Sequence, residues 1–199
     1  MMSRWSLRLL LMLGLALGAA AALQAQNDTS PLHPPKGAKV ALVVFEDLEC
    51  PDCARAAPII AEAERTYKIP VVRYDFPLPQ HPWAFDAAVM GHYFDSKDAK
   101  LGVQFREYIF KNQNAINPAT LRMYADKFCK EHNTTLPFVV DPQGKFAAEV
   151  RADRAVGNRV GIDHTPTLYV VSDSKRGKPF VEVTDRSQLF QMIDQMKGE

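Results

Sequence analysis

Cysteine is scarce in this chain, with three among 199 residues. So few cysteines exclude a small fold held together by a framework of disulfide bonds. Charge of one sign is also lacking, because 24 lysines and arginines nearly balance 23 acidic residues. A net charge of +1 gives no reason to expect binding to nucleic acid. Hydrophobic residues make up 47% of the chain, which is enough to bury one sizeable core, so we expect one folded domain.

The one long apolar run lies at the amino terminus. Residues 1–8 carry two arginines and no acid, residues 9–23 are apolar, and small residues lead to Ala25. This order predicts a signal peptide over 1–25, cleaved after Ala25. A membrane anchor is the alternative, but about 15 apolar residues are fewer than the ~20 that span a bilayer. We therefore expect a mature protein in the periplasm or secreted, in an oxidising compartment.

A Cys-x-x-Cys pair, Cys50-Pro51-Asp52-Cys53, follows an apolar run and a short acidic turn and opens a helical pattern. The start of a helix presents free N–H groups and the positive end of the dipole, which lowers the pKa of Cys50. Pro51 suits the first helical position, where no N–H is needed. Cys53 falls one turn further along the same face, within reach of a disulfide. The pattern predicts a dithiol–disulfide active site.

Apolar periodicity predicts a strand over 40–45, a helix over 53–67 and a strand over 69–76, the start of a βαβ unit. Residues 83–130 have helical periodicity, and we expect their aromatic faces to pack on neighbouring helices. Residues 136–146 are compatible with a hairpin or with a loop leading to a helix over 146–160, and we favour the helix. Two strands and a closing helix are expected at 167–171, 180–183 and 186–197.

The second informative stretch runs from Gly161 through His164, Thr165 and Pro166 to Leu168. A proline lacks the N–H that a strand ladder needs, so Pro166 must stand at the first position of the strand or at an edge. A cis Thr165–Pro166 bond would turn the backbone N–H and C=O of Thr165 outward. On these residues alone, an ordinary trans turn is the simpler interpretation.

Taken together, the two stretches resemble the DsbA-like branch of the thioredoxin superfamily, as does Phe76-Pro-Leu-Pro-Gln-His81-Pro. The resemblance covers residues 39–198. It implies an α/β fold with a thioredoxin-like core, in which a central mixed sheet is flanked by helices, and an inserted helical domain. The segments that it implies are the first part of the core over 39–79, a helical insertion over 80–160 and the second part of the core over 161–199. Before them, prolines and polar residues without periodicity predict a flexible leader over 26–38.

The resemblance also implies the roles of single residues. Cys50 corresponds to the attacking cysteine and Cys53 to its more buried partner. Pro166 corresponds to a cis-proline that faces the disulfide, and Thr165 offers backbone hydrogen bonds to an extended substrate peptide. The implied reaction is exchange with client proteins through a mixed disulfide on Cys50, resolved by Cys53. No cofactor is expected. We expect a monomer and a membrane partner that resets the redox state.

Two positions depart from the family pattern. Val44 stands where many relatives have a buried acid, so the proton of Cys53 would pass through water or Glu46. Pro51 and Asp52 are the residues expected to tune the redox potential, and Asp52 stands where DsbA has histidine. A carboxylate there should raise the pKa of Cys50, and we expect the other acids of the preceding turn to act in the same direction. This predicts a protein less oxidising than DsbA.

Several interpretations of function stay open. An oxidase of secreted proteins is the first choice, a reductase or isomerase the second, and a thioredoxin-fold binding module without turnover the third. A zinc site that includes Cys129 has no supporting second Cys-x-x-Cys, and Ala54 after Cys53 excludes haem attachment. Cys129 itself is expected to be a buried, inert thiol, with a regulatory role as the alternative. His164 could tune Cys50, contact substrate or lie on a surface turn. The remaining histidines, at 33, 81, 92 and 132, form no recognisable constellation.

Overall fold

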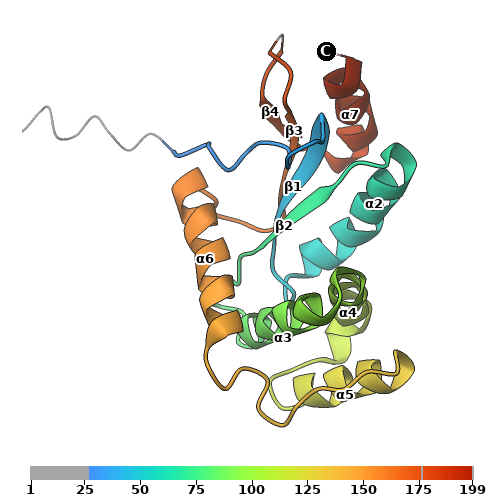
Figure 1. Ribbon diagram of the computed structural model, residues 1–199, viewed down its shortest axis with the longest axis vertical. Helices are drawn as coiled ribbons and strands as arrows, with labels where there is room; N and C mark the ends of the chain where they lie inside the picture. Colours follow the sequence, from blue (N-terminus) through green and yellow to red (C-terminus); the bar gives the residue numbers. More distant parts are fainter. Residues whose placement is uncertain (1–26, 176, 199) are drawn as a thin grey trace, which may run out of the picture.

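The computed structural model describes residues 27–175 and 177–198, so the expected signal peptide lies outside the described residues. Figure 1 shows a sheet with helices on both faces and a group of helices beyond one end of it. In chain order, the elements are β1 (Val40–Glu46), α2 (Pro51–Tyr67), β2 (Val71–Asp75), α3 (Ala84–Lys97), α4 (Ala99–Asn112), the 3-10 helix η1 (Gln113–Ala115), α5 (Leu121–Glu131), α6 (Lys145–Val160), β3 (Thr167–Ser172), β4 (Phe180–Glu182), the 3-10 helix η2 (Arg186–Gln188) and α7 (Leu189–Gly198).

The four strands form one mixed sheet in the order β2-β1-β3-β4. β1 pairs parallel with β2 and antiparallel with β3, and β3 pairs antiparallel with β4. Every residue of β1 is buried, as expected for a central strand covered on both faces. Leu42 and Val44 face α2 and α7, whereas Val43 and Phe45 face α6. The predicted mixed sheet flanked by helices is therefore confirmed.

Helices α3 to α6 lie between β2 and β3 in the chain, and the helix predicted over 146–160 is present as α6. Phe94, Phe105 and Phe128 pack at the centre of α3, α4 and α5, with ring centroids 4.7 to 5.3 Å apart. The predicted packing of aromatic faces is confirmed. Cys50 and Cys53 belong to the same buried cluster as these rings. The cysteine pair therefore lies where the end of the sheet meets the helical group.

The segment before β1, predicted from the sequence to be a flexible leader, contacts the folded core. Asp28 N–H donates to the carbonyl oxygen of Arg159 at 2.8 Å, and Leu32 is buried against α6 and the sheet. Proline-rich sequence prevents regular secondary structure here, but one buried leucine and a backbone hydrogen bond are enough to hold the segment on the core.

No helix in the described part of the chain is long and apolar enough to cross a membrane.

Candidate active site

Cys50 stands at the N-cap of α2 with extended backbone angles, φ −74° and ψ 120°, and Pro51 begins the helix as predicted. The turn before it is closed by a hydrogen bond from Cys50 N–H to Asp47 O, at 3.0 Å. Gln113 of η1 secures the same turn, because its Nε2 donates to the carbonyl oxygens of Leu48 at 2.8 Å and Cys50 at 3.0 Å. No sequence signal marks Gln113 as part of the site.

The two stretches identified from the sequence meet at Cys50. The Thr165–Pro166 bond is cis, as the family resemblance implied, and the thiol of Cys50 donates to Thr165 O at 3.2 Å. Cys50 is 7% exposed and Cys53 is 2% exposed, so Cys50 is the more accessible sulfur. Cys53 Sγ accepts a hydrogen bond from Asp47 N–H at 3.4 Å. Both cysteines are free thiols here, which is the reduced form of the pair.

The pKa of Cys50 is lowered to about 5. A hydrogen bond from the Cys53 thiol, and others from the backbone N–H groups of Cys53 and Asp52, stabilise its thiolate against the opposing effect of burial. Burial raises the pKa of Cys53 strongly, and the neighbouring Cys50 thiolate adds to this effect. The pair is therefore asymmetric, with one sulfur held as an anion and the other as a thiol.

Asp52, which the sequence predicts to raise the pKa of Cys50, is paired with two arginines in the structure. The Asp52 carboxylate accepts hydrogen bonds from Arg186 at 2.7 Å and from Arg55 at 3.2 Å. The Arg186 hydrogen bond lowers the pKa of Asp52 itself, so its charge is largely compensated. Arg186 comes from η2, 134 residues further along the chain, and no sequence pattern connects it with Asp52.

The other acids of the turn act as structural acceptors. Asp47 accepts from the backbone N–H groups of Glu49 and Leu78 and contacts His81 Nδ1, each at 2.7 Å. Glu49 accepts from Trp83 N–H at 2.7 Å and Ala84 N–H at 3.1 Å, at the start of α3. The contact between Asp47 and His81 is not predicted from the sequence, which places His81 in no group of functional residues. Asp47 and Glu49 serve as acceptors for groups from the segment that leads into α3. They join the active-site turn to the helical group.

Glu46, the last residue of β1, is the buried acid of this region. It is 2% exposed, and Arg73 Nη1 donates to its Oε2 at 3.1 Å. Burial raises the pKa of Glu46. Its charge also contributes to the raised pKa of Cys53, so the two groups are within electrostatic reach. Glu46 lies two positions after Val44. Because it is buried and within electrostatic reach of Cys53, it is a candidate proton carrier for that thiol.

His164 and Cys129 lie apart from this arrangement. The His164 side chain is 63% exposed and contacts Asp163 at 2.7 Å, on the turn before Thr165. Cys129 is 5% exposed within the packed helices, as expected for a buried thiol, and burial raises its pKa.

We expect the Cys50 thiolate to titrate with a midpoint at about pH 5, measured by thiolate absorbance or by the pH dependence of alkylation. Reactivity should be full at pH 7 and should fall as the pH drops through that midpoint, because protonation removes the nucleophile. Cys53→Ala removes the strongest stabilising hydrogen bond and should raise the midpoint. A midpoint near the ordinary thiol value of about 8.5 in the unaltered protein would contradict this assignment.

Arg186→Gln should raise the midpoint of Cys50 by about one pH unit, because it removes a cation and exposes the charge of Asp52 to the thiolate. Both cysteines contribute to the raised pKa of Arg186, after the larger effect of its hydrogen bond with Asp52, so the guanidinium lies within electrostatic reach of the pair. Arg65→Gln is the matched control, since Arg65 pairs with Glu62 on the exposed surface of α2. An equal titration in the two variants would show that Arg186 has no electrostatic effect on the site.

The profile of the thioredoxin family (Thioredoxin_4) matches residues 27–182. Among solved structures, α-DsbA1 of Wolbachia pipientis superposes with a TM-score of 0.67 at 14% identity, covering 83% of this chain and 89% of that one. The thiol-disulfide exchange protein α-DsbA2 of the same organism has a TM-score of 0.63 at 18% identity, with coverages of 82% and 85%. The catalytic domain of Proteus mirabilis ScsC has a TM-score of 0.65 at 18% identity, with coverages of 84% and 88%.

Two curated relatives are sodium/proton antiporters of Salinispora. NhaA 3 of Salinispora tropica is 26% identical over 147 residues, which are 72% of this chain and 22% of that protein. NhaA 1 of Salinispora arenicola is 25% identical over 157 residues, 78% of this chain and 24% of that protein. The chain thus spans less than a quarter of the length of these relatives.

The chain belongs to the thioredoxin family, with a DsbA-like fold. The cysteine pair stands at the start of α2 within this fold. The resemblance that the sequence indicated is confirmed at the level of family and fold.

Proposed function

We propose that this protein oxidises client proteins by donating the Cys50–Cys53 disulfide to them. The observation that carries the proposal is the asymmetry of the pair, in which the pKa of Cys50 is lowered to about 5 and that of buried Cys53 is raised. The cis Thr165–Pro166 bond beside Cys50 supports a binding edge for an extended client segment. Thr165 and Pro166 are the proposed substrate-binding residues.

The reaction starts from the disulfide form. A client thiolate attacks Cys50 Sγ, the Cys50–Cys53 bond breaks, and Cys53 leaves with the electron pair. Because the pKa of Cys53 is raised, its sulfur takes up a proton as it leaves, and Glu46 is the proposed donor. A second client thiolate then attacks the client sulfur of the mixed disulfide and releases the Cys50 thiolate. The client loses two electrons, and the protein becomes the dithiol.

The low pKa of Cys50 favours transfer of electrons from the client to this protein. A thiolate with a pKa of about 5 stabilises the reduced form above that pH, and the stabilisation disappears as the pH falls through 5. Relative to an ordinary thiol with a pKa of about 8.5, the gain at pH 7 is about 3 kcal/mol. For a two-electron couple, this makes the disulfide more oxidising by about 60 mV. The hydrogen bonds around Cys50 thus favour donation of the disulfide.

The proposed compartment is the periplasm, supported by the apolar amino-terminal segment and by the oxidising chemistry. In that setting the reduced protein needs an electron acceptor, and a membrane oxidant is the proposed partner. We propose that the protein acts as a monomer.

The deciding experiment is the reduction potential of the Cys50–Cys53 couple, measured by equilibration with glutathione buffers and thiol alkylation. A value near DsbA's, about −120 mV, supports the oxidase. A value near thioredoxin's, about −270 mV, would instead make the protein a reductant that needs an electron source. If the protein does not turn over a dithiol peptide, whichever of these two potentials it has, the remaining interpretation is a binding module with the thioredoxin fold.

A further inference from the structure

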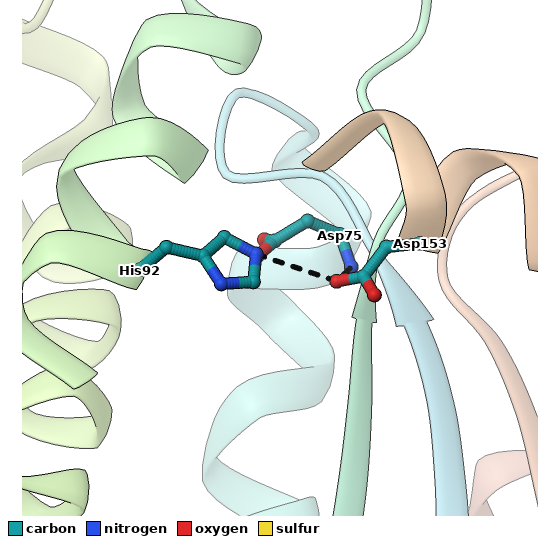
Figure 2. A group of neighbouring side chains, drawn as sticks. All are labelled: Asp75, His92 and Asp153. Atoms are coloured by element: carbon teal, nitrogen blue, oxygen red, sulfur yellow. Dashed lines mark hydrogen bonds and ion pairs between the residues drawn. The ribbon is translucent and has the colours of Figure 1, made fainter. Parts of the chain in front are cut away.

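A second cluster of reactive side chains lies away from the cysteine pair. Asp75 is the last residue of β2, His92 belongs to α3 and Asp153 belongs to α6. Figure 2 shows the three side chains converging from these three elements on one point. The ligand atoms that they offer all lie within 4.8 Å of one another. Side chains of these types are common ligands of divalent metal ions.

The spacing of the ligand atoms is that of a metal site. His92 Nε2 lies 3.2 Å from Asp75 Oδ2 and 3.4 Å from Asp153 Oδ2. Zinc binds imidazole nitrogen and carboxylate oxygen at about 2.0–2.2 Å in tetrahedral geometry, which places two ligands about 3.3–3.5 Å apart. The distance from His92 to Asp153 lies in this range, and the distance from His92 to Asp75 is slightly shorter.

Unsatisfied buried atoms are a separate observation. Asp75 is 2% exposed, yet its Oδ1 has no hydrogen-bond partner among the described residues. His92 Nε2 is also buried and, within residues 27–175 and 177–198, makes no hydrogen bond of acceptable geometry, although two carboxylates are close. Of these two atoms, His92 Nε2 is the one that faces both aspartates, and an ion bound there would satisfy it.

Acidic side chains are concentrated around His92. Asp75, Glu149 and Asp153 each place a carboxylate oxygen 3.2 to 3.4 Å from a ring nitrogen of His92. Arg106 donates to Asp75, and Lys145 lies 3.9 Å from Glu149. A group of three carboxylates around one imidazole attracts a cation.

Two neighbours fit the surroundings of a bound metal. Glu149 Oε2 lies 3.3 Å from His92 Nδ1, where it favours a proton on Nδ1 and leaves Nε2 for a metal. Arg106 Nη2 donates to Asp75 Oδ2 at 2.8 Å, and metal-binding carboxylates commonly accept such hydrogen bonds. A carboxylate has lone pairs enough for both partners.

We propose that Asp75, His92 and Asp153 bind a divalent metal ion of the zinc type, with water completing the coordination. Without the ion, a proton occupies the position between His92 and the carboxylates, so binding is competitive with protons. The metal would tie α3 and α6 of the helical group to the end of β2. This role is independent of the proposed exchange at Cys50, and either proposal can fail without the other.

The test uses the full chain with Cys50→Ser and Cys53→Ser, because free thiols would bind zinc themselves. Competition with a chromophoric chelator should show one zinc per chain. Thermal unfolding should move up by about 5–10 °C when free zinc exceeds its Kd a hundredfold. Cobalt in place of zinc should give visible absorption bands of a tetrahedral site without thiolate bands. Absence of stoichiometric binding would overturn the proposal and identify the cluster as an ion-pair network.

Substitutions of single residues test which side chains form the proposed zinc site. His92→Gln and Asp153→Asn should each remove the bound zinc and the thermal shift, whereas His33→Gln, at an exposed histidine, should retain both. Asp153→Asn keeps an oxygen that can accept the Asp75 N–H hydrogen bond, present here at 3.1 Å, so this variant should fold even if His92→Gln does not. Zinc binding that survives in folded Asp153→Asn protein would overturn the assignment.

Discussion

Cys50→Ala and Cys53→Ala are each expected to abolish oxidation of a dithiol client, because neither variant can form the Cys50–Cys53 disulfide. Cys53→Ala should still form a mixed disulfide through Cys50 that it cannot resolve. At pH 7 Cys50, with a pKa of about 5, is almost entirely thiolate, whereas an ordinary cysteine is only a few per cent ionised. Loss of Cys50 removes this nucleophile and leaves a buried thiol with a raised pKa, so exchange should slow at least about 100-fold. The measurement is the oxidation rate of a reduced dithiol peptide in the presence of an electron acceptor.

The Cys53→Ala variant provides a qualitative check. When given a client that already contains a disulfide, it should accumulate a covalent adduct at Cys50, visible by mass spectrometry and released by a reductant. Cys129→Ala should keep the rate of the unaltered protein, because that thiol lies buried among the helices. An adduct that forms in the Cys50→Ala variant instead would reverse the assigned roles of the two cysteines.

Arg106→Met should destabilise the protein by about 3–5 kcal/mol, because it removes the cation from a group of buried carboxylates. The guanidinium is 6% exposed and donates to Asp75 and Asp95, each at 2.8 Å, and lies 3.8 Å from Glu46. Methionine fills much of the space but leaves these charges uncompensated. Denaturant unfolding with a chelator present measures the change without any contribution from metal.

Arg65→Met serves as the comparison for Arg106→Met. It breaks the ion pair with Glu62 on the exposed surface of α2, and we expect a loss of at most about 1 kcal/mol. Similar stabilities for the two variants would mean that the buried carboxylates are neutralised by protons rather than by Arg106.

Local sequence was sufficient to predict that the cysteine pair stands at the start of a helix. Pro51 at the first helical position and the apolar run before the turn are short-range signals, and short-range backbone physics decides them. The cis bond before Pro166 could not be predicted from the local residues, because these alone favoured a trans turn. Resemblance to a family supplied that expectation, and the structure confirms it.

The electrostatics of the site could not be predicted in the same way. Asp52 was expected to oppose the Cys50 thiolate, but Arg186 is hydrogen-bonded to it and compensates its charge. The effect of a carboxylate on a neighbouring pKa depends on which cation reaches it, and tertiary contacts alone determine that. Asp47 shows the same limit, because its contact with His81 crosses 34 residues of chain.

The sequence by itself determined that this protein has a dithiol at a helix start in an α/β fold, because hydrophobic periodicity and turn chemistry act over a few residues. Tertiary structure alone decided which charges meet. Folding placed the carbonyl oxygen of Thr165 beside Cys50, Arg186 against Asp52, and His92 between two aspartates from other elements. Each of these contacts joins residues that are distant in the chain, and local sequence patterns do not indicate which distant residues meet in space.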